Sequence, residues 1–161
     1  MVHDIGKAGI GNTVLEKPGK LTPEEFDLVK EHTIIGAGLF TADPCDIAEM
    51  AHEISLHHHQ KWNGKGYPVI EGIALSGAAI PLSARLTAIA DVFDALVSPR
   101  CYKKQWDFES ATSLLREEAG EHFDPELIHS FMEILDTVSM IYTRYPDPKP
   151  SVPEGTQAQE H

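Results

Sequence analysis

Apolar side chains recur at helical spacing along several stretches of the chain, and no stretch alternates in the way that is typical of a strand. Residues three and four apart share one face of a helix, so each stretch can bury that face against another. The stretches predict helices from about 22 to the early 40s, from 43 to the histidines at 57–59, and over about 83–97, 107–119 and 124–143. The pattern therefore predicts an all-α helical bundle.

The predicted helices begin at recognisable signals. Thr22 precedes Pro23, and Asp43 and Asp124 each precede a proline, which combines a capping side chain with the residue that suits a first helical turn. Asp107 is a further capping residue. These signals set the boundaries of the predicted elements more firmly than the apolar spacing does.

The predicted helix at 83–97 is apolar nearly all round, which predicts burial on every side. It nevertheless contains Asp91 and Asp94. A buried carboxylate is costly unless it is paired or bound to a metal ion. We therefore expect at least one of the two to have such a partner, while Asp94 fits a surface position equally well.

Three consecutive histidines, at 57–59, end the second predicted helix and lead into the loop Asn63-Gly64-Lys65-Gly66-Tyr67-Pro68. Adjacent helical residues point about 100° apart, so the three cannot face one point. Two neighbours at a fraying helix end can each reach a different metal ion, which predicts a two-metal centre. The glycines and the proline indicate a rigid turn that carries the Tyr67 ring. A surface histidine run before an ordinary turn is the alternative.

Length and charge limit the classes of protein that fit. The chain has 161 residues, 42% of them hydrophobic, which suits one domain with a tail. A formal net charge of -12 argues against binding to nucleic-acid polymers and to acidic membrane surfaces. The chain shows neither a signal-peptide pattern nor an apolar run of about 20 residues, and it has two cysteines, so we expect a cytoplasmic protein.

The end of the sequence differs from the rest in composition. From Tyr145 onward, prolines alternate with charged and small polar residues. Such a segment cannot bury enough apolar surface to offset the entropy of ordering. We therefore predict a domain over residues 1–144 and a disordered tail over 145–161.

Further candidate ligands and cations lie outside the histidine run. His3 and Asp4 open the chain, His32 lies within the first long predicted helix, and Arg100 and Lys103 follow the helix that carries Asp91. Each one alone also fits an ordinary surface or core position. Together the histidines and aspartates form a nitrogen and oxygen ligand set without thiolate, which suits iron, manganese or a similar divalent ion.

Several motifs, in order, resemble those of the HD-GYP family. They are His3-Asp4-Ile5-Gly6-Lys7; Lys17-Pro18-Gly19-Lys20-Leu21-Thr22 with Glu25 and His32; His58-His59 leading to Gly66-Tyr67-Pro68; Ile80-Pro81-Leu82; Ala90-Asp91-Val92-Phe93-Asp94-Ala95-Leu96; and Phe123-Asp124-Pro125. The resemblance covers about residues 2 to 135. It implies an HD-superfamily helical bundle and a metal-dependent phosphodiesterase that hydrolyses the bacterial second messenger cyclic di-GMP in signal transduction.

The resemblance also implies roles for individual residues. The expected metal ligands are His3, Asp4, His32, His58, His59 and Asp91. Asp4 would bridge two ions and, with Lys7, take part in catalysis. Lys7, Arg100 and Lys103 would hold the substrate phosphates, and Tyr67 would border the pocket. The loop at 63–68 would contact GGDEF-type synthase domains, and the resemblance leaves an oligomer open. Two ions about 3.5 to 4 Å apart suit in-line hydrolysis of a phosphodiester.

The sequence departs from the family pattern at three places. Gln60 and Asn63 stand where the family usually has Glu and often has Asp. A further ligand that the family carries on a helix before the His-Asp pair has no counterpart, so we expect an amino-terminally truncated domain, a misassigned start or a fragment of a longer protein, with weakened activity. Two alternatives stay open: a catalytically silent binding module of cyclic di-GMP signalling, and another nucleotide phosphohydrolase of the HD superfamily.

Overall fold

The computed structural model describes residues 2–41, 45–98 and 105–145. The elements in chain order are η1 (Ile5–Gly9), α1 (Asn12–Leu15), α2 (Pro23–Lys30), α3 (His32–Gly38), α4 (Asp46–His57), η2 (Gly77–Ala79), α5 (Leu82–Val97), α6 (Phe108–Glu117), α7 (Pro125–Glu133) and α8 (Leu135–Arg144). No strand forms among the described residues, where β pairing is limited to two isolated bridges. The predicted all-α fold is confirmed.

Three of the predicted helix starts are capped as expected. The Thr22 side chain accepts a hydrogen bond from the Glu25 backbone, and the Glu25 carboxylate accepts one from the Thr22 backbone, so the two form a capping box. Asp107 accepts from the Ser110 backbone at the start of α6. Asp124 caps α7 in the same way. The expected cap at Asp43 lies outside the described residues.

Two long predicted helices are each divided in the structure. The helix predicted from about 22 to the early 40s forms two helices, α2, which ends at Lys30, and α3, which begins at His32. The helix predicted over 124–143 forms α7 and α8, which are separated at Ile134. Ile134 has φ -103° and ψ 12°, well away from helical values. Apolar spacing continues across both breaks, so a periodicity argument reads each pair of helices as one.

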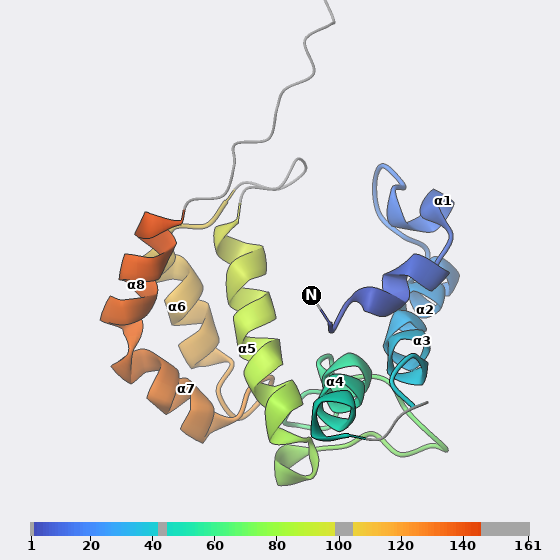
Figure 1. The fold of residues 1–161 in the computed structure, drawn as a ribbon. Helices are drawn as coiled ribbons and strands as arrows, with labels where there is room; N and C mark the ends of the chain where they lie inside the picture. Colours follow the sequence, from blue (N-terminus) through green and yellow to red (C-terminus); the bar gives the residue numbers. More distant parts are fainter. Residues whose placement is uncertain (1, 42–44, 99–104, 146–161) are drawn as a thin grey trace, which may run out of the picture.

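Helix α5 runs between two groups of helices (Figure 1). On one side lie η1, α2 and α3, with α4 against α5, and on the other lie α6, α7 and α8. The prediction that α5 is buried all round is wrong, because Leu82 and Leu86 are 53% and 50% exposed. The helix is covered on its flanks only, which leaves one stripe of its surface open to solvent.

The interiors on the two sides of α5 differ in chemistry. An apolar cluster joins α5 to α6 and α7, and its buried members are Ala88, Ile89, Phe93, Leu96, Val97, Ala111, Leu115, Phe123 and Ile128. On the other side many buried side chains are polar: His3, His32, Thr33, Ser55, His58 and Gln60. This polar interior contains the candidate site.

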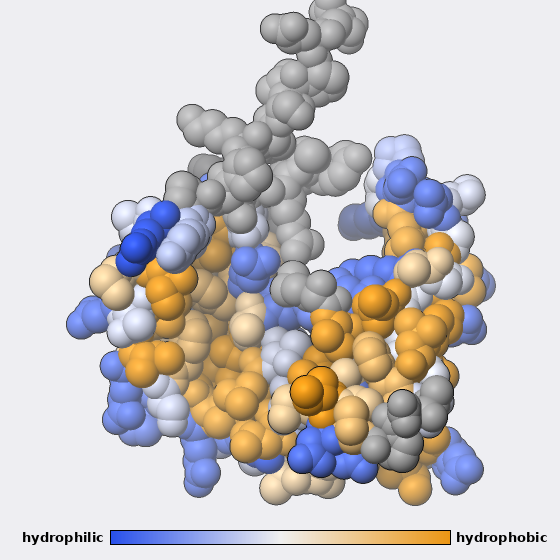
Figure 2. Space-filling model, in the orientation of Figure 1, coloured by the Kyte–Doolittle hydropathy of each residue, from blue (hydrophilic) through white to orange (hydrophobic). Residues whose placement is uncertain are grey.

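The surface also carries apolar side chains. Figure 2 shows them over α4 on one part of the visible face and over α7 and α8 on another. Ile47 and Met50 of α4 and Met140 and Ile141 of α8 are among the exposed large apolar residues. No helix among the described residues is long and apolar enough to cross a membrane.

Candidate metal centre

His3 and Asp4 stand directly before η1, which packs closely on α3. The close approach requires Gly6, because a Cβ atom there would lie 1.9 Å from the His32 carbonyl oxygen and 2.5 Å from the Gly36 nitrogen. Helix α4 holds the same turn from another side, since the Ser55 hydroxyl donates to the Val2 carbonyl at 3.1 Å. Backbone packing therefore delivers the Asp4 carboxylate to the space between α3 and α4.

His32 and His58 present the same nitrogen to that space. His32 Nδ1 lies 2.6 Å from the Val29 carbonyl oxygen, and His58 Nδ1 lies 2.9 Å from the Ile54 carbonyl oxygen. A carbonyl only accepts hydrogen bonds, so each Nδ1 carries the proton and each Nε2 exposes a lone pair. The two Nε2 atoms are 3.4 Å apart. A backbone partner on the far nitrogen is typical of metal-ligating histidines.

The Asp4 carboxylate completes a group of electron-pair donors. Its Oδ1 lies 3.5 Å from His32 Nε2 and 4.0 Å from His58 Nε2, and it is buried without a hydrogen-bond donor among the described residues. Ligand atoms of Asp4, His32, His58 and His59 all lie within 4.8 Å of one another. Buried acceptors that face each other repel unless a cation lies among them. The group therefore fits a divalent metal ion.

The other oxygen of Asp4 faces a second pair of residues. His3 Nε2 lies 3.5 Å from Asp4 Oδ2 and 3.4 Å from Asp91 Oδ1. Asp4 thus offers one oxygen to the histidines of α3 and α4 and the other to His3 and Asp91. This arrangement brings all six expected ligands together around one carboxylate.

His58 and His59 correct one expectation. They were expected to reach different ions, but both contribute ligand atoms to the same group with Asp4 and His32. The physical reason is that α4 ends at His57, with His58 as its C-cap. The turn that follows brings the His58 and His59 ring centroids to within 4.0 Å. His57 takes no part in the group.

Burial keeps the clustered histidines neutral. It lowers the pKa of His58 to about 4 and that of His59 to about 3, and it lowers the pKa of His32 as well. Neutral imidazole is the form that binds metal. His3 behaves in the opposite way, because the Asp4 and Asp91 carboxylates close to its Nε2 raise its pKa to about 9.

The two carboxylates are held in the ionised form. Burial tends to raise the pKa of Asp4, but the neighbouring His3 ring and the hydrogen bond from Lys7 outweigh it and bring the pKa well below the usual range. The nearby His3 ring likewise lowers the pKa of Asp91. Lys7 Nζ lies 2.6 Å from Asp4 Oδ2. Before any metal binds, charge on His3 and Lys7 therefore balances charge on the carboxylates.

The loop after the histidines is fixed against them. The Tyr67 ring stacks on the His59 ring with centroids 4.6 Å apart. Gln60 Nε2 donates to the Pro68 carbonyl at 2.6 Å, which ties the end of the loop to its start. A Cβ atom on Gly66 would lie 2.5 Å from the His59 carbonyl oxygen, so the loop folds this tightly only with glycine. Tyr67 therefore lies against a residue of the cluster, and its role at the border of a substrate pocket stays a prediction.

Other residues that the sequence singled out are not part of the cluster in the described structure. Asn63 donates from its amide to Glu121 at 2.8 Å and so ties the loop to the segment before α7. Asp94 is exposed. Arg100 and Lys103, expected to hold phosphate, lie outside the described residues. Sequence reasoning missed Phe26 as a residue near the loop, since it had only the signature of a helical core position.

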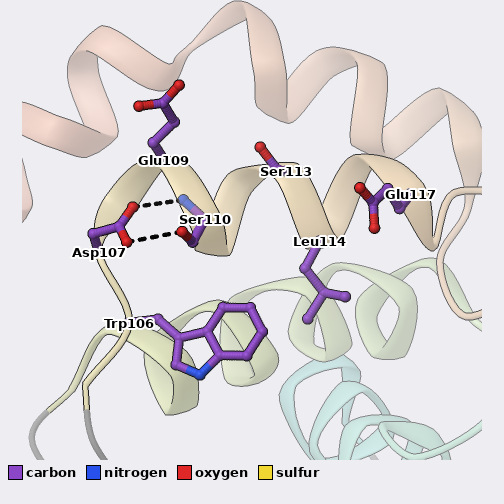
Figure 3. A pocket seen from close by; sticks show the side chains of 7 residues that line it. All are labelled: Trp106, Asp107, Glu109, Ser110, Ser113, Leu114 and Glu117. Carbon is purple, nitrogen blue, oxygen red and sulfur yellow. Dashed lines mark hydrogen bonds between the residues drawn. The ribbon is translucent and has the colours of Figure 1, made fainter.

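Of two surface hollows, one reaches the ligand cluster and the other does not. One opens at His3 and Asp91 and extends along α5 toward Phe131 and Tyr142 on α7 and α8, giving the site a route to solvent. The other lies beside α6, where Figure 3 shows Asp107 bonded to Ser110. Its ionisable side chains are all acidic and it contains no histidine, so it has no part in the metal centre.

Comparisons with known proteins identify the family of this chain. The sequence profile of the HD domain family matches residues 1–127. A cyclic di-GMP phosphodiesterase from Vibrio cholerae serotype O1 is 44% identical over 151 residues, covering 91% of this chain. One from Thermotoga maritima is 39% identical over 146 residues, also covering 91%. A 3'3'-cGAMP-specific phosphodiesterase 2 from Vibrio cholerae serotype O1 has the same identity and coverage of this chain as the Thermotoga protein.

These relatives are much longer than the matched region. The alignments cover 30%, 39% and 27% of their respective lengths. The chain therefore spans about a third of the curated relatives that it matches. The region that matches the HD domain family includes the His-Asp pair, the histidine run and α5.

Proposed function

We propose that this chain, which belongs to the HD domain family, is a metal-dependent phosphodiesterase that hydrolyses cyclic di-GMP. The resemblance to the HD-GYP branch is confirmed by relatives that are named cyclic di-GMP phosphodiesterases. The observation that carries the proposal is the group of buried electron-pair donors around Asp4. That group needs a cation, and a divalent cation is what hydrolysis of a phosphodiester uses.

The proposed centre holds two divalent ions, iron or manganese. Asp4 Oδ1 with His32, His58 and His59 would bind one, and Asp4 Oδ2 with His3 and Asp91 would bind the other. Nitrogen and oxygen donors without thiolate suit these metals. When bound, such ions lower the pKa of a water molecule and withdraw charge from the phosphoryl oxygens.

The chain's own residues would prepare and confine the reaction. Asp4 is ionised and shared between both ligand groups, so it fixes their separation. Lys7 lies on the same carboxylate oxygen as His3 and is half-exposed, which lets it orient Asp4 and pair with a substrate phosphate. The stacked Tyr67 ring shields His59 from water. Arg100 and Lys103 are proposed to hold the phosphates, as the family resemblance implies.

The choice between cyclic dinucleotides is a separate question. Cyclic di-GMP and 3'3'-cGAMP offer the same phosphodiester linkages and differ in one base, so a metal centre alone does not distinguish them. We favour cyclic di-GMP because two relatives, 44% and 43% identical, carry that activity in their names, one of them as a probable activity. Discrimination must come from groups that contact the bases.

The test compares two carboxylates one turn apart on α5. The purified chain is reconstituted anaerobically with iron or manganese, and its metal content and hydrolysis of both cyclic dinucleotides are measured. We expect about two equivalents of metal and turnover of cyclic di-GMP. Asp91→Asn should lower the metal content to about one equivalent and reduce kcat more than about 10-fold, because it removes a ligand rather than an outer contact.

Asp94→Asn is the matched control. Asp94 is exposed and its carboxylate accepts a hydrogen bond from the Ser98 hydroxyl, so Asp94→Asn should keep both metals. Less than half an equivalent of every transition metal in the wild-type chain would refute the binuclear centre. Full metal content without hydrolysis of either dinucleotide would favour the silent binding module.

A further inference from the structure

A groove lies on the far side of Tyr67 from the metal centre. Helix α2 and the start of α3 form one wall, and residues 61–69 form the other. Its volume of about 560 Å³ is within the usual range for small-molecule sites. Tyr67 belongs to both places, because its ring stacks on His59 while its edge meets Phe26 at a centroid distance of 6.3 Å. One aromatic ring therefore separates the groove from a proposed metal ligand.

The walls of the groove offer flat aromatic and apolar surface. Phe26 is 45% exposed even though it is one of the chain's larger apolar side chains. Val69 and Ile34 beside it are also exposed. Partly exposed rings of this kind provide platforms on which nucleobases stack, because every base has a π face.

Charges of both signs line the same groove, with lysine in excess. Its lysines are Lys30, Lys61 and Lys65 and its acidic residues are Asp27 and Glu31, in a chain of net charge -12. Lys30 Nζ lies 4.8 Å from the Phe26 ring centroid and 5.8 Å from that of Tyr67. Lys30 pairs with Asp27, while Lys61 and Lys65 have no ion-pair partner among the described residues. The combination of rings and cations suits an anionic ligand with a flat base.

We propose that this groove is a purine nucleotide subsite, in which a base of the cyclic dinucleotide stacks on Phe26 beside Tyr67 and Lys65 faces a phosphate. The assignment rests on the proposed function only for the identity of the substrate. It gives the chain a base contact outside the metal ligands, and a stacking contact of this kind accepts guanine and adenine alike. An acidic peptide would use the lysines but would leave the exposed ring without a purpose.

The test measures binding of GMP and of ribose 5-phosphate to the manganese-loaded chain by calorimetry. Both ligands carry a phosphate, but only GMP carries a base. We expect GMP to bind at least about fivefold more tightly than ribose 5-phosphate, as loss of one stacked base normally costs at least that factor. Phe26→Leu should remove most of this difference, and Phe26→Tyr should retain it.

Two lysine variants test the charge contribution. Lys65→Ala should weaken GMP binding and reduce its dependence on salt concentration, whereas Lys20→Ala, an exposed lysine outside the groove, should not. Equal affinity of the wild-type chain for the two ligands, or unchanged GMP affinity in Phe26→Leu, would overturn the subsite.

Hydrolysis is measured separately, so that the subsite and the enzyme can fail independently. Dependence of GMP affinity on Phe26 without turnover of a cyclic dinucleotide would support the subsite and refute the enzyme. Turnover of a cyclic dinucleotide with GMP binding independent of Phe26 would support the enzyme and refute the subsite. Where both hold, Phe26→Leu should raise KM for cyclic di-GMP far more than it changes kcat, because the ring is distant from the reacting phosphate.

Discussion

The interiors on the two sides of α5 are built on different principles. Toward α6 and α7, α5 turns Phe93, Leu96 and Val97 into an apolar cluster that excludes water. Toward α3 and α4, it turns Asp91 to His3 and to a set of buried histidines. Residues 91 and 93 are about 200° apart around the helix, so one element serves both interiors.

This difference separates stability from chemistry within one small domain. The apolar side gains free energy from burial alone and needs no ligand. The histidine side buries groups that repel one another until a cation binds, so its local structure is maintained by the backbone contacts around it. The apolar side can thus act as a rigid support for a site that is intrinsically costly to assemble.

The largest expected effect comes from the apolar side. Leu115 on α6 is fully buried, so Leu115→Ala should lower the free energy of unfolding by about 2–5 kcal/mol through lost burial and the cavity left behind. The folded fraction should keep the metal content of the wild-type chain, because no ligand touches Leu115. Chemical denaturation together with elemental analysis measures both quantities.

Leu39→Ala is the control for that comparison. Leu39 is 59% exposed, and the substitution should change stability by no more than about 0.5 kcal/mol. Loss of metal in proportion to loss of stability in Leu115→Ala would show that the two interiors are coupled. The view that the apolar side is a rigid support, independent of the histidine side, would then be wrong.

A second, smaller effect should appear when metal is removed and pH is varied. His58 and His59 have folded-state pKa values of about 4 and 3, below their ordinary value of 6.5, so their contribution to stability is lost as pH falls below 6.5. His3 has a raised pKa of about 9, so its contribution is present below 6.5 and is lost as pH rises toward 9. Stability of the metal-free chain should therefore peak near pH 6.5.

Melting of the chelated chain across this pH range measures the peak. We expect changes of about 1–3 kcal/mol on either side, since one unit of pKa shift corresponds to about 1.4 kcal/mol. His3→Gln should abolish the loss at high pH and leave the loss at low pH. His129→Gln, at an exposed position on α7, should alter neither the loss of stability at low pH nor the loss at high pH. A flat profile would mean that the histidine side contributes no pH-dependent free energy.

The smallest expected effect concerns the capping box of α2. Thr22→Ala removes one half of the reciprocal pair with Glu25 and should cost about 1 kcal/mol. Hydrogen exchange should increase in α2 while α6 and α7 stay protected. Uniform loss of protection throughout the chain would indicate that the two sides of α5 unfold as one cooperative unit.

Much of the fold was predictable because its signals are local. The caps at Thr22, Asp107 and Asp124 fix helix starts through side chains within three residues, and all three are present. The breaks at Glu31 and Ile134 depend on how separate helices pack, which apolar spacing does not record. The expected domain boundary at 144 stays a prediction, as does the contact of residues 63–68 with GGDEF-type synthase domains.

The candidate site was predictable in its members and less so in its geometry. The six expected ligands do converge, since the family resemblance fixes their identities. The sharing of one ligand group by His58 and His59 was not foreseen, because it depends on the turn after α4. Phe26 gave no chemical signal at all, since its exposure follows from the packing of α2 beside a loop forty residues away.

Gly6 has a consequence for any attempt to engineer or screen this domain. It carries no functional group, yet the smallest side chain there would strike the His32 backbone and lift the His-Asp segment away from the other histidines. In a library of random variants selected for activity, Gly6 would be as intolerant of change as a metal ligand. A scan that reads intolerance as chemistry would assign a catalytic role to a position whose whole contribution is the absence of an atom.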